Sequence, residues 1–305
     1  MLSYPILFIV TKLDLILINN SFKVKKSILF LIVLITIISG CKPTRNEGKP
    51  SGKLFIIGGG NRTEAMLNEL IDMAGIRSEG YMFVLPMSSS EPDSAILWAK
   101  DDFSITGIKN ITGFNFKKGE AIPQEKIDSL RNAKLIYISG GDQSRFMDAV
   151  LSTPIYDTIH EAYQNGAIIS GTSAGAAVMS RKMITGNQIK HPESDAGFTT
   201  IEADNIEITE GLGLLTDVII DQHFIKRQRL NRLVAASIEN PDQLCVGIDE
   251  STAIIVDGNT ATVTGISQVI VIKNTGKRKS LQNGLLGIND LNISVYLPGQ
   301  SFKLR

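Results

Sequence analysis

Cysteine and histidine are scarce in this chain of 305 residues, which contains two cysteines and three histidines. The histidines, His160, His191 and His223, lie far apart and lack ligand spacing, so the sequence predicts no metal site. The glycine run at 58–60 lacks both the GxGxxG spacing and a phosphate-loop lysine, so no cofactor is predicted. We interpret this run as a tight turn that forms the floor of a site.

An excess of either charge is also absent. Lysine plus arginine and aspartate plus glutamate both total 31, and no long block of like charge occurs. Nucleic acid is therefore not an expected partner, because no basic stripe is present to hold its phosphates. Apolar residues make up 43% of the chain, which is enough for one substantial hydrophobic core.

The apolar run near the N-terminus is short. Residues 28–38 follow a cluster of three lysines and are almost entirely apolar. About a dozen residues are too few for a helix that spans a bilayer, which needs ~20, so the pattern predicts an export signal. The run ends in ISGC, which resembles the lipobox of bacterial lipoproteins with Cys41 as the lipidated residue. An ordinary signal peptide or a buried cysteine is the alternative.

These features predict three parts of the chain. Residues 1–40 form an N-terminal extension and lipoprotein signal peptide, 41–52 form a polar tether, and 53–305 form a single domain. Lipidation at Cys41 predicts an exported, membrane-anchored lipoprotein, periplasmic or on the cell surface. Cys245 is then the remaining thiol, so no internal disulfide is expected and a buried structural role is predicted for it.

Short apolar runs alternate with longer amphipathic segments from residue 54 onward. The runs at 54–57, 82–85, 135–138 and 167–169 predict strands, and the segments at 63–74, 93–103, 144–150 and 153–164 predict helices. This alternation predicts an α/β fold with a mostly parallel central sheet sandwiched by helices. The runs at 252–256, 261–265 and 268–272 predict a β-rich C-terminal extension, antiparallel to that sheet and forming its edge.

The segment GTSAGA at residues 171–176 places Ser173 directly after a predicted strand. A serine at the tip of a sharp strand-to-helix turn exposes its hydroxyl, and the N–H groups that follow it can stabilise an oxyanion. Small neighbours leave room for the tight turn and for an acyl group. The segment therefore indicates a nucleophile, although a small-residue turn that only packs a helix on a sheet remains an alternative.

A serine nucleophile needs a base, and His223 is the best placed histidine. It follows the apolar run at 218–220, so it is expected at the carboxyl end of a strand, where ligand sites of α/β sheets lie. Asp249 and Glu250 follow the predicted strand at 244–248 in the same way, and one of them can orient the imidazole. A structural histidine and a solvated acidic turn are the alternatives.

Three arginines follow His223 within ten residues. Arg227, Arg229 and Arg232 suit bidentate binding of carboxylates, and Asp221 beside them supplies the opposite charge. The segment indicates a site for a substrate that carries both a carboxylate and a cation. A solvated basic face is the alternative.

Taken together, the motifs GGDQ, GTSAGA, GLGLL before DVIIDQHF, RxRxxRL and GIDEST resemble those of the cyanophycinase family of serine peptidases. The resemblance runs from about Lys53 to LPGQSFKL near the C-terminus. It implies a fold of the class I glutamine amidotransferase-like or flavodoxin-like type, related to aspartyl dipeptidases. It also implies a possible homodimer.

The resemblance assigns roles position by position. Ser173, His223 and Glu250 match a catalytic Ser-His-Glu triad, and Ala174 with Gly141 is expected to form the oxyanion hole. The positions that match the family's substrate pocket are Gln143, Asp221, Gln222, Arg227, Arg229 and Arg232. We expect Asp221 to pair with a substrate guanidinium and the arginines to hold substrate carboxylates.

The implied activity is hydrolysis of cyanophycin, a polyaspartate whose β-carboxyls carry arginine, to β-Asp-Arg dipeptides. An export signal sets this chain apart from members that act on intracellular granules, so other aspartyl or isoaspartyl peptides remain possible substrates. An aspartyl dipeptidase-like enzyme and an inactive lipid-anchored binding protein are the competing functions.

Overall fold

The computed structural model describes residues 50–194, 197–276 and 279–305. The predicted signal segment 1–40, the lipidation site Cys41 and most of the tether 41–52 lie outside the described residues. Across the described residues, no helix combines the length and apolarity that crossing a membrane requires.

Five parallel strands form one side of an eight-stranded sheet, in the order β1-β5-β4-β2-β3. Their bounds are β1 (Leu54–Ile57), β2 (Met82–Leu85), β3 (Ile111–Gly113), β4 (Leu135–Ile138) and β5 (Ile168–Thr172). Every residue of β1, β2, β4 and β5 is buried, as expected for parallel strands that are covered on both faces.

The other side of this sheet is antiparallel. Three C-terminal strands continue outward from β1 in the order β10-β11-β16. Their bounds are β10 (Thr252–Asp257), β11 (Thr260–Gly265) and β16 (Ser301–Lys303). The predicted antiparallel extension of the sheet is therefore confirmed for the runs at 252–256 and 261–265.

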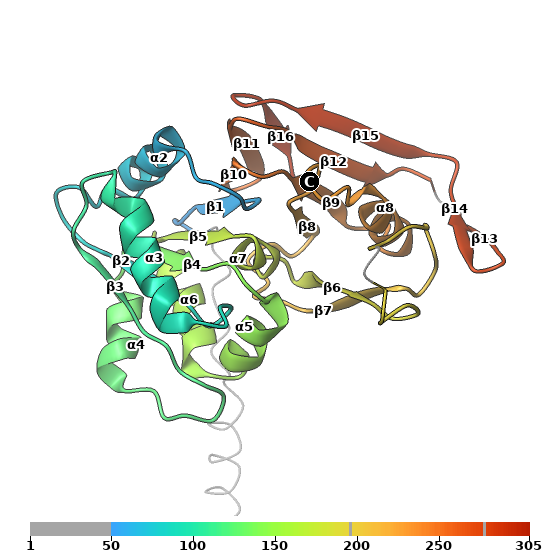
Figure 1. Ribbon diagram of the computed structural model, residues 1–305. Coiled ribbons are helices and arrows are strands. Elements are labelled where there is room, and N and C mark those ends of the chain that lie inside the picture. The colour runs from blue at the N-terminus through green and yellow to red at the C-terminus, as the bar shows by residue number, and fades with distance from the viewer. Residues whose placement is uncertain (1–49, 195–196, 277–278) are drawn as a thin grey trace, which may run out of the picture. The chain divides into compact units, whose positions relative to one another are not determined.

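Helices cover both faces of the large sheet (Figure 1). Alternate residues of β1 face opposite clusters: Phe55 and Ile57 pack with helices α2 and α3, and Leu54 and Ile56 share a cluster with residues of α4 to α7. The helices are α2 (Glu64–Ala74), α3 (Pro92–Ser104), α4 (Gln124–Arg131), α5 (Gln143–Val150), α6 (Pro154–Gln164) and α7 (Ala174–Ala177). The predicted sandwich of helices around a mostly parallel sheet is confirmed.

A second sheet of four strands, in the order β15-β12-β9-β8, lies on the C-terminal side of the chain (Figure 1). Its strands are β8 (Val218–Gln222), β9 (Leu244–Ile248), β12 (Val269–Asn274) and β15 (Leu291–Tyr296). Helix α8 (Leu230–Glu239) packs on it, and Cys245 is buried in the cluster between them as a free thiol. The expectation that the segment at 268–272 extends the central sheet is wrong, because β12 pairs with β9 and β15 instead.

Two small hairpins complete the described part of the chain. Strands β6 (Lys182–Gln188) and β7 (Ile206–Glu210) form one, and strands β13 (Ser280–Gln282) and β14 (Leu285–Gly287) form the other. Residues of β6 and β7 pack in the same cluster as α8, so the first hairpin contributes to the core under the second sheet.

Candidate active site

Ser173 stands at a sharp turn between β5 and α7. Its backbone adopts φ 54° and ψ −110°, in the sparsely populated positive-φ region. Gly171 faces the Gly175 carbonyl and Gly175 faces the Ile138 carbonyl, each so closely that a side chain has no room. The small residues of GTSAGA are therefore required by the packing of the turn, and the turn holds the hydroxyl of Ser173 at the edge of the sheet.

A continuous chain of hydrogen bonds joins Ser173, His223 and Glu250. The Nε2 atom of His223 lies 2.8 Å from the Ser173 hydroxyl, and its Nδ1 atom lies 2.6 Å from Oε1 of Glu250. Ser173 follows β5 of the large sheet. His223 and Glu250 follow β8 and β9, which belong to the second sheet. The three side chains therefore do not come from one sheet, and the site lies where two sheets meet.

The loop after β1 ties the three segments of the site together. The N–H of Ser173 donates to the Ile57 carbonyl (3.0 Å), that of His223 to Gly58 (2.7 Å) and that of Ser251 to Gly59 (2.8 Å). The glycine run forms the floor of the site, as the sequence predicts.

Burial and two arginines lower the pKa of His223. Loss of hydration is the largest cause, the bond to Glu250 opposes it, and Arg227 and Arg229 add to the decrease. The imidazole is therefore neutral near pH 7, which is the state that can accept a proton from serine.

Asp249 has a different task from its neighbour Glu250. Its carboxylate accepts hydrogen bonds from the N–H groups of Ile225 (3.1 Å) and Lys226 (2.9 Å) and from the Ser267 hydroxyl (2.7 Å). Burial opposes its ionisation, but these bonds outweigh burial and lower the pKa of Asp249. Asp249 thus anchors the turn that follows His223, and Glu250 is the residue that contacts the imidazole.

The predicted oxyanion donors lie beside the nucleophile. Ala174 is the first residue of α7 and is completely buried. Gly140, which precedes Gly141, passes so close to Ser173 that a methyl group on it would lie 3.5 Å from the Cβ atom of Ser173. Gly141 has φ +137° and packs against the Ser88 carbonyl, so this loop is fixed next to the hydroxyl of Ser173.

Asp221 occupies an internal ion pair. It is 1% exposed, and both of its carboxylate oxygens accept from Arg232, with the Nε–Oδ2 distance at 2.7 Å. Arg229 approaches the same carboxylate at 3.7 Å. We expected Asp221 to bind a guanidinium of the substrate. In the structure its carboxylate is instead paired with Arg232 and Arg229 of the protein itself.

The remaining predicted pocket residues divide into internal and accessible ones. Gln143 is buried and donates to the carbonyls of Ile184 (2.9 Å) and Thr185. Gln222 is buried, and its backbone carbonyl and side chain both accept from Arg229. Burial, followed by the charge of Arg232, lowers the pKa of Arg229 to about 10.

Arg227 is exposed, as are Ile225, Lys226 and Gln228 beside it in the chain. Of the six predicted substrate-binding residues, only Arg227 and the partly buried Arg229 present accessible surface of any extent. Within the described residues, no group of three or more His, Cys, Asp or Glu side chains is gathered as metal ligands are.

Comparison with known proteins places this chain in a family. The model of Peptidase family S51 matches residues 54–264. The chain belongs to this family. It is a serine-type peptidase.

Curated relatives of this S51 peptidase cover most of its length. It is 30% identical to the cyanophycinase of Synechococcus elongatus over 87% of this chain and 83% of that protein. It is 29% identical to the cyanophycinase of Nostoc sp. over 74% of this chain and 76% of that protein. A crystal structure of a peptidase from an acI-B1 Actinobacterium has the same fold, with a TM-score of 0.62 and 22% identity over 84% of this chain and 98% of that one.

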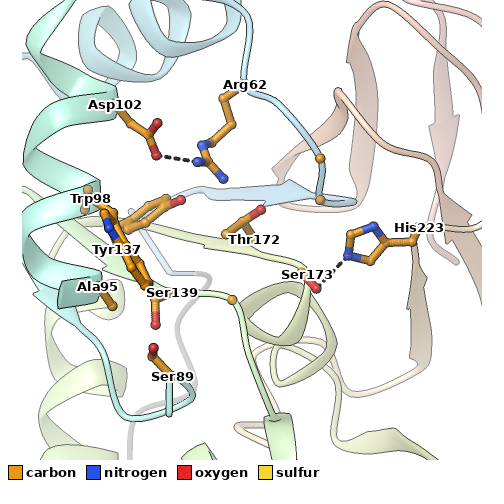
Figure 2. A pocket seen from close by; sticks show the side chains of 14 residues that line it. Arg62, Ser89, Ala95, Trp98, Asp102, Tyr137, Ser139, Thr172, Ser173 and His223 are labelled. Atoms are coloured by element: carbon orange, nitrogen blue, oxygen red, sulfur yellow. Dashed lines mark hydrogen bonds and ion pairs between the residues drawn. The ribbon is translucent and has the colours of Figure 1, made fainter. Parts of the chain in front are cut away.

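The S51 peptidase also has a pocket that the sequence did not reveal (Figure 2). Ser173 and His223 line it at one end, and Arg62, Asp102 and Tyr137 line it at the other. Arg62 lies two positions after the glycine run, which the sequence had marked as part of a site. Asp102 lies forty positions further along the chain, so nothing in the sequence indicated that these two side chains meet.

Proposed function

We propose that this peptidase hydrolyses cyanophycin to β-Asp-Arg dipeptides through a Ser-His-Glu triad. The observation that carries the proposal is the hydrogen-bonded series Ser173–His223–Glu250 in an S51 chain that is about 30% identical to cyanophycinases. The exposed Arg227 and the partly buried Arg229 beside His223 support an anionic group in the substrate, because arginine binds carboxylates in a bidentate manner.

In the proposed reaction, the Ser173 hydroxyl attacks the peptide carbonyl carbon while Nε2 of His223 takes its proton. Glu250 holds the proton on Nδ1 and stabilises the imidazolium that forms. The N–H groups of Ala174 and Gly141 bind the oxyanion, and each contributes ~3 kcal/mol to lowering the barrier. His223 then protonates the leaving amine, and a water molecule deprotonated by the same imidazole releases the acyl group and restores the serine.

The function is tested by incubating purified cyanophycin with the full chain and with the fragment 49–305. A Ser173→Ala variant serves as the matched control. Release of β-Asp-Arg dipeptides by the unmodified protein alone supports the proposal. Turnover restricted to short aspartyl peptides indicates a dipeptidase-like enzyme, and binding without turnover indicates a binding protein; either outcome contradicts the proposal.

We also propose that the chain is exported and anchored to a membrane through a lipid on Cys41. The motif ISGC after a short apolar run supports this proposal. Labelling of the expressed full chain with a radioactive fatty acid tests it, with Cys41→Ser as the control. Equal label in both proteins, or none in either, contradicts the anchor without affecting the proposed peptidase activity.

A further inference from the structure

The pocket beside the nucleophile has a second group of polar side chains at the end far from Ser173. The cavity measures about 290 Å³ and begins at Ser173 and His223. Arg62, Trp98, Asp102 and Tyr137 form its other end (Figure 2). This volume accommodates one side chain of a substrate rather than a long stretch of polymer.

Hydrogen-bond donors outnumber acceptors at this end. Arg62 donates through Nη2 to Asp102, and its buried Nε has no partner among the described residues. The buried Thr172 hydroxyl is also without a partner there. Figure 2 shows the hydroxyls of Tyr137 and Thr172 pointing toward the guanidinium of Arg62. Unsatisfied buried donors are costly, so a ligand that accepts from them is favoured.

The charge of the pocket agrees with an acceptor ligand. The pKa of Arg62 is raised by the neighbouring Tyr137 and by Asp102, although burial opposes the increase, so the guanidinium stays charged. The ion pair leaves most of the N–H donors of the guanidinium unused, because this group carries five. A second guanidinium, brought by a substrate, would meet Arg62 and be repelled.

We propose that Arg62, Tyr137 and Thr172 form a subsite for a carboxylate of the substrate, next to the bond that Ser173 attacks. The subsite deepens the proposed peptidase function and rests on it for its place in the reaction. The carboxylate accepts from the free edge of the Arg62 guanidinium and from the two hydroxyls, and Trp98 forms an apolar wall beside it.

Two sources supply such a group in aspartate and arginine polymers. One is the α-carboxylate of an arginine attached through an isopeptide bond, and the other is a free aspartyl β-carboxylate. Three synthetic peptides distinguish them: a trimer of β-Asp-Arg units, the same trimer with arginine carboxamides, and triaspartate.

The test compares kcat/KM of the unmodified protein and Arg62→Gln on these peptides. We expect the variant to lose about 10- to 100-fold on peptides whose carboxylate occupies the subsite, because charge-assisted hydrogen bonds are lost. The loss falls on the β-Asp-Arg trimer if the arginine α-carboxylate binds, and on triaspartate if the aspartyl group binds. On the carboxamide trimer we expect a change below about threefold in the first case. An equal loss on all three peptides, or none on any, overturns the subsite.

Two further variants separate ligand binding from scaffolding. Asp102→Asn removes the partner of Arg62 but leaves the donors, so we expect it to retain the preference for the carboxylate peptide. Loss of that preference in Asp102→Asn, equal to the loss in Arg62→Gln, would mean that the ion pair acts only as a scaffold. Arg131→Gln on α4 removes another ion-paired arginine, on the opposite face of the sheet, and should leave all rates unchanged.

Binding measurements keep the subsite separate from the proposed function. Titration calorimetry with the same peptides is carried out on Ser173→Ala, with and without Arg62→Gln. If peptide binding depends on Arg62 but the unmodified protein does not hydrolyse the peptides, the proposed function is contradicted and the subsite is supported. Turnover of β-Asp-Arg peptides, together with rates and affinities that Arg62→Gln leaves unchanged for all three peptides, would keep the proposed function and remove the subsite.

Discussion

Gly59 faces the ring of His223 with no space between them for a side chain. A methyl group on Gly59 would lie 2.8 Å from Nδ1 and closer still to Cε1 and Nε2. Gly60 stands in the same relation to Glu250, where a methyl group would lie 2.7 Å from Cβ. The glycine run therefore fixes the imidazole and the carboxylate by contact, in addition to the backbone hydrogen bonds that it accepts.

Gly59→Ala is expected to displace His223 and reduce kcat. The substitution adds overlap with the ring to the strain of a backbone at φ +111°. We expect a loss of kcat of about 100-fold or more, because a misplaced base no longer reaches the serine. Steady-state kinetics on an aspartyl peptide measures the effect.

Gly75→Ala is the matched control, since Gly75 has φ +66° but open space around it. This variant should lose only about 1 kcal/mol of stability and no activity. Equal activity in the two variants would show that contact with Gly59 does not position the imidazole.

The acidic limb of the pH–rate profile is expected to reflect the pKa of the His223 imidazole. The imidazole acts as a base only when neutral, so kcat/KM rises with pH through its pKa and then levels off. Because burial and the two arginines lower this pKa below its ordinary value, the plateau should extend into mildly acidic solution.

Arg227→Gln is expected to move this limb to higher pH. The substitution removes one positive charge that lowers the pKa of His223, and the exposed position of Arg227 makes it replaceable without loss of packing. Added salt should reduce the difference between the two proteins, because it screens exposed charges. A limb that stays in place, or moves to lower pH, contradicts the electrostatic link.

Asp221→Ala is expected to destabilise the fold rather than alter substrate choice. It leaves the buried guanidinium of Arg232 without its partner, which typically costs about 3–5 kcal/mol. Urea unfolding measures the loss, and the Asp221→Ala, Arg232→Met double variant should recover part of it. Lys118→Ala, which breaks an exposed pair with Asp148, should change stability by less than about 1 kcal/mol. Full stability with weaker binding of arginine-bearing peptides alone would restore Asp221 as a substrate ligand.

The two adjacent acids are expected to give different phenotypes. Glu250→Gln removes the charge that stabilises the imidazolium, so kcat should fall by about 10²- to 10⁴-fold with little change in stability. Asp249→Asn weakens the anchor of the turn at Ile225 and Lys226, so its main effect should be on thermal stability. Calorimetry and kinetics on both variants check the assignment, which an exchange of the two phenotypes would refute.

Local pattern fixed the strands of the large sheet and the position of the nucleophile. The runs at 54–57, 82–85 and 135–138 form strands with the predicted bounds, because continuous aliphatic runs of this length suit buried parallel strands. Ser173 was recognisable because a strained turn against neighbouring backbone needs small residues around it.

Long-range contacts decided the rest. Sheet membership depends on which strand edges pair, so the sequence did not show that β8 and β9 form a sheet apart from β5. Asp221 and its arginines are close in sequence, but only packing determined that their charges neutralise one another internally. The amino-acid sequence alone determined the kinds of chemical group and their order along the chain. The tertiary structure decided which of them meet, because contacts such as Arg62 with Asp102 join helices and loops whose separation along the chain leaves no local pattern.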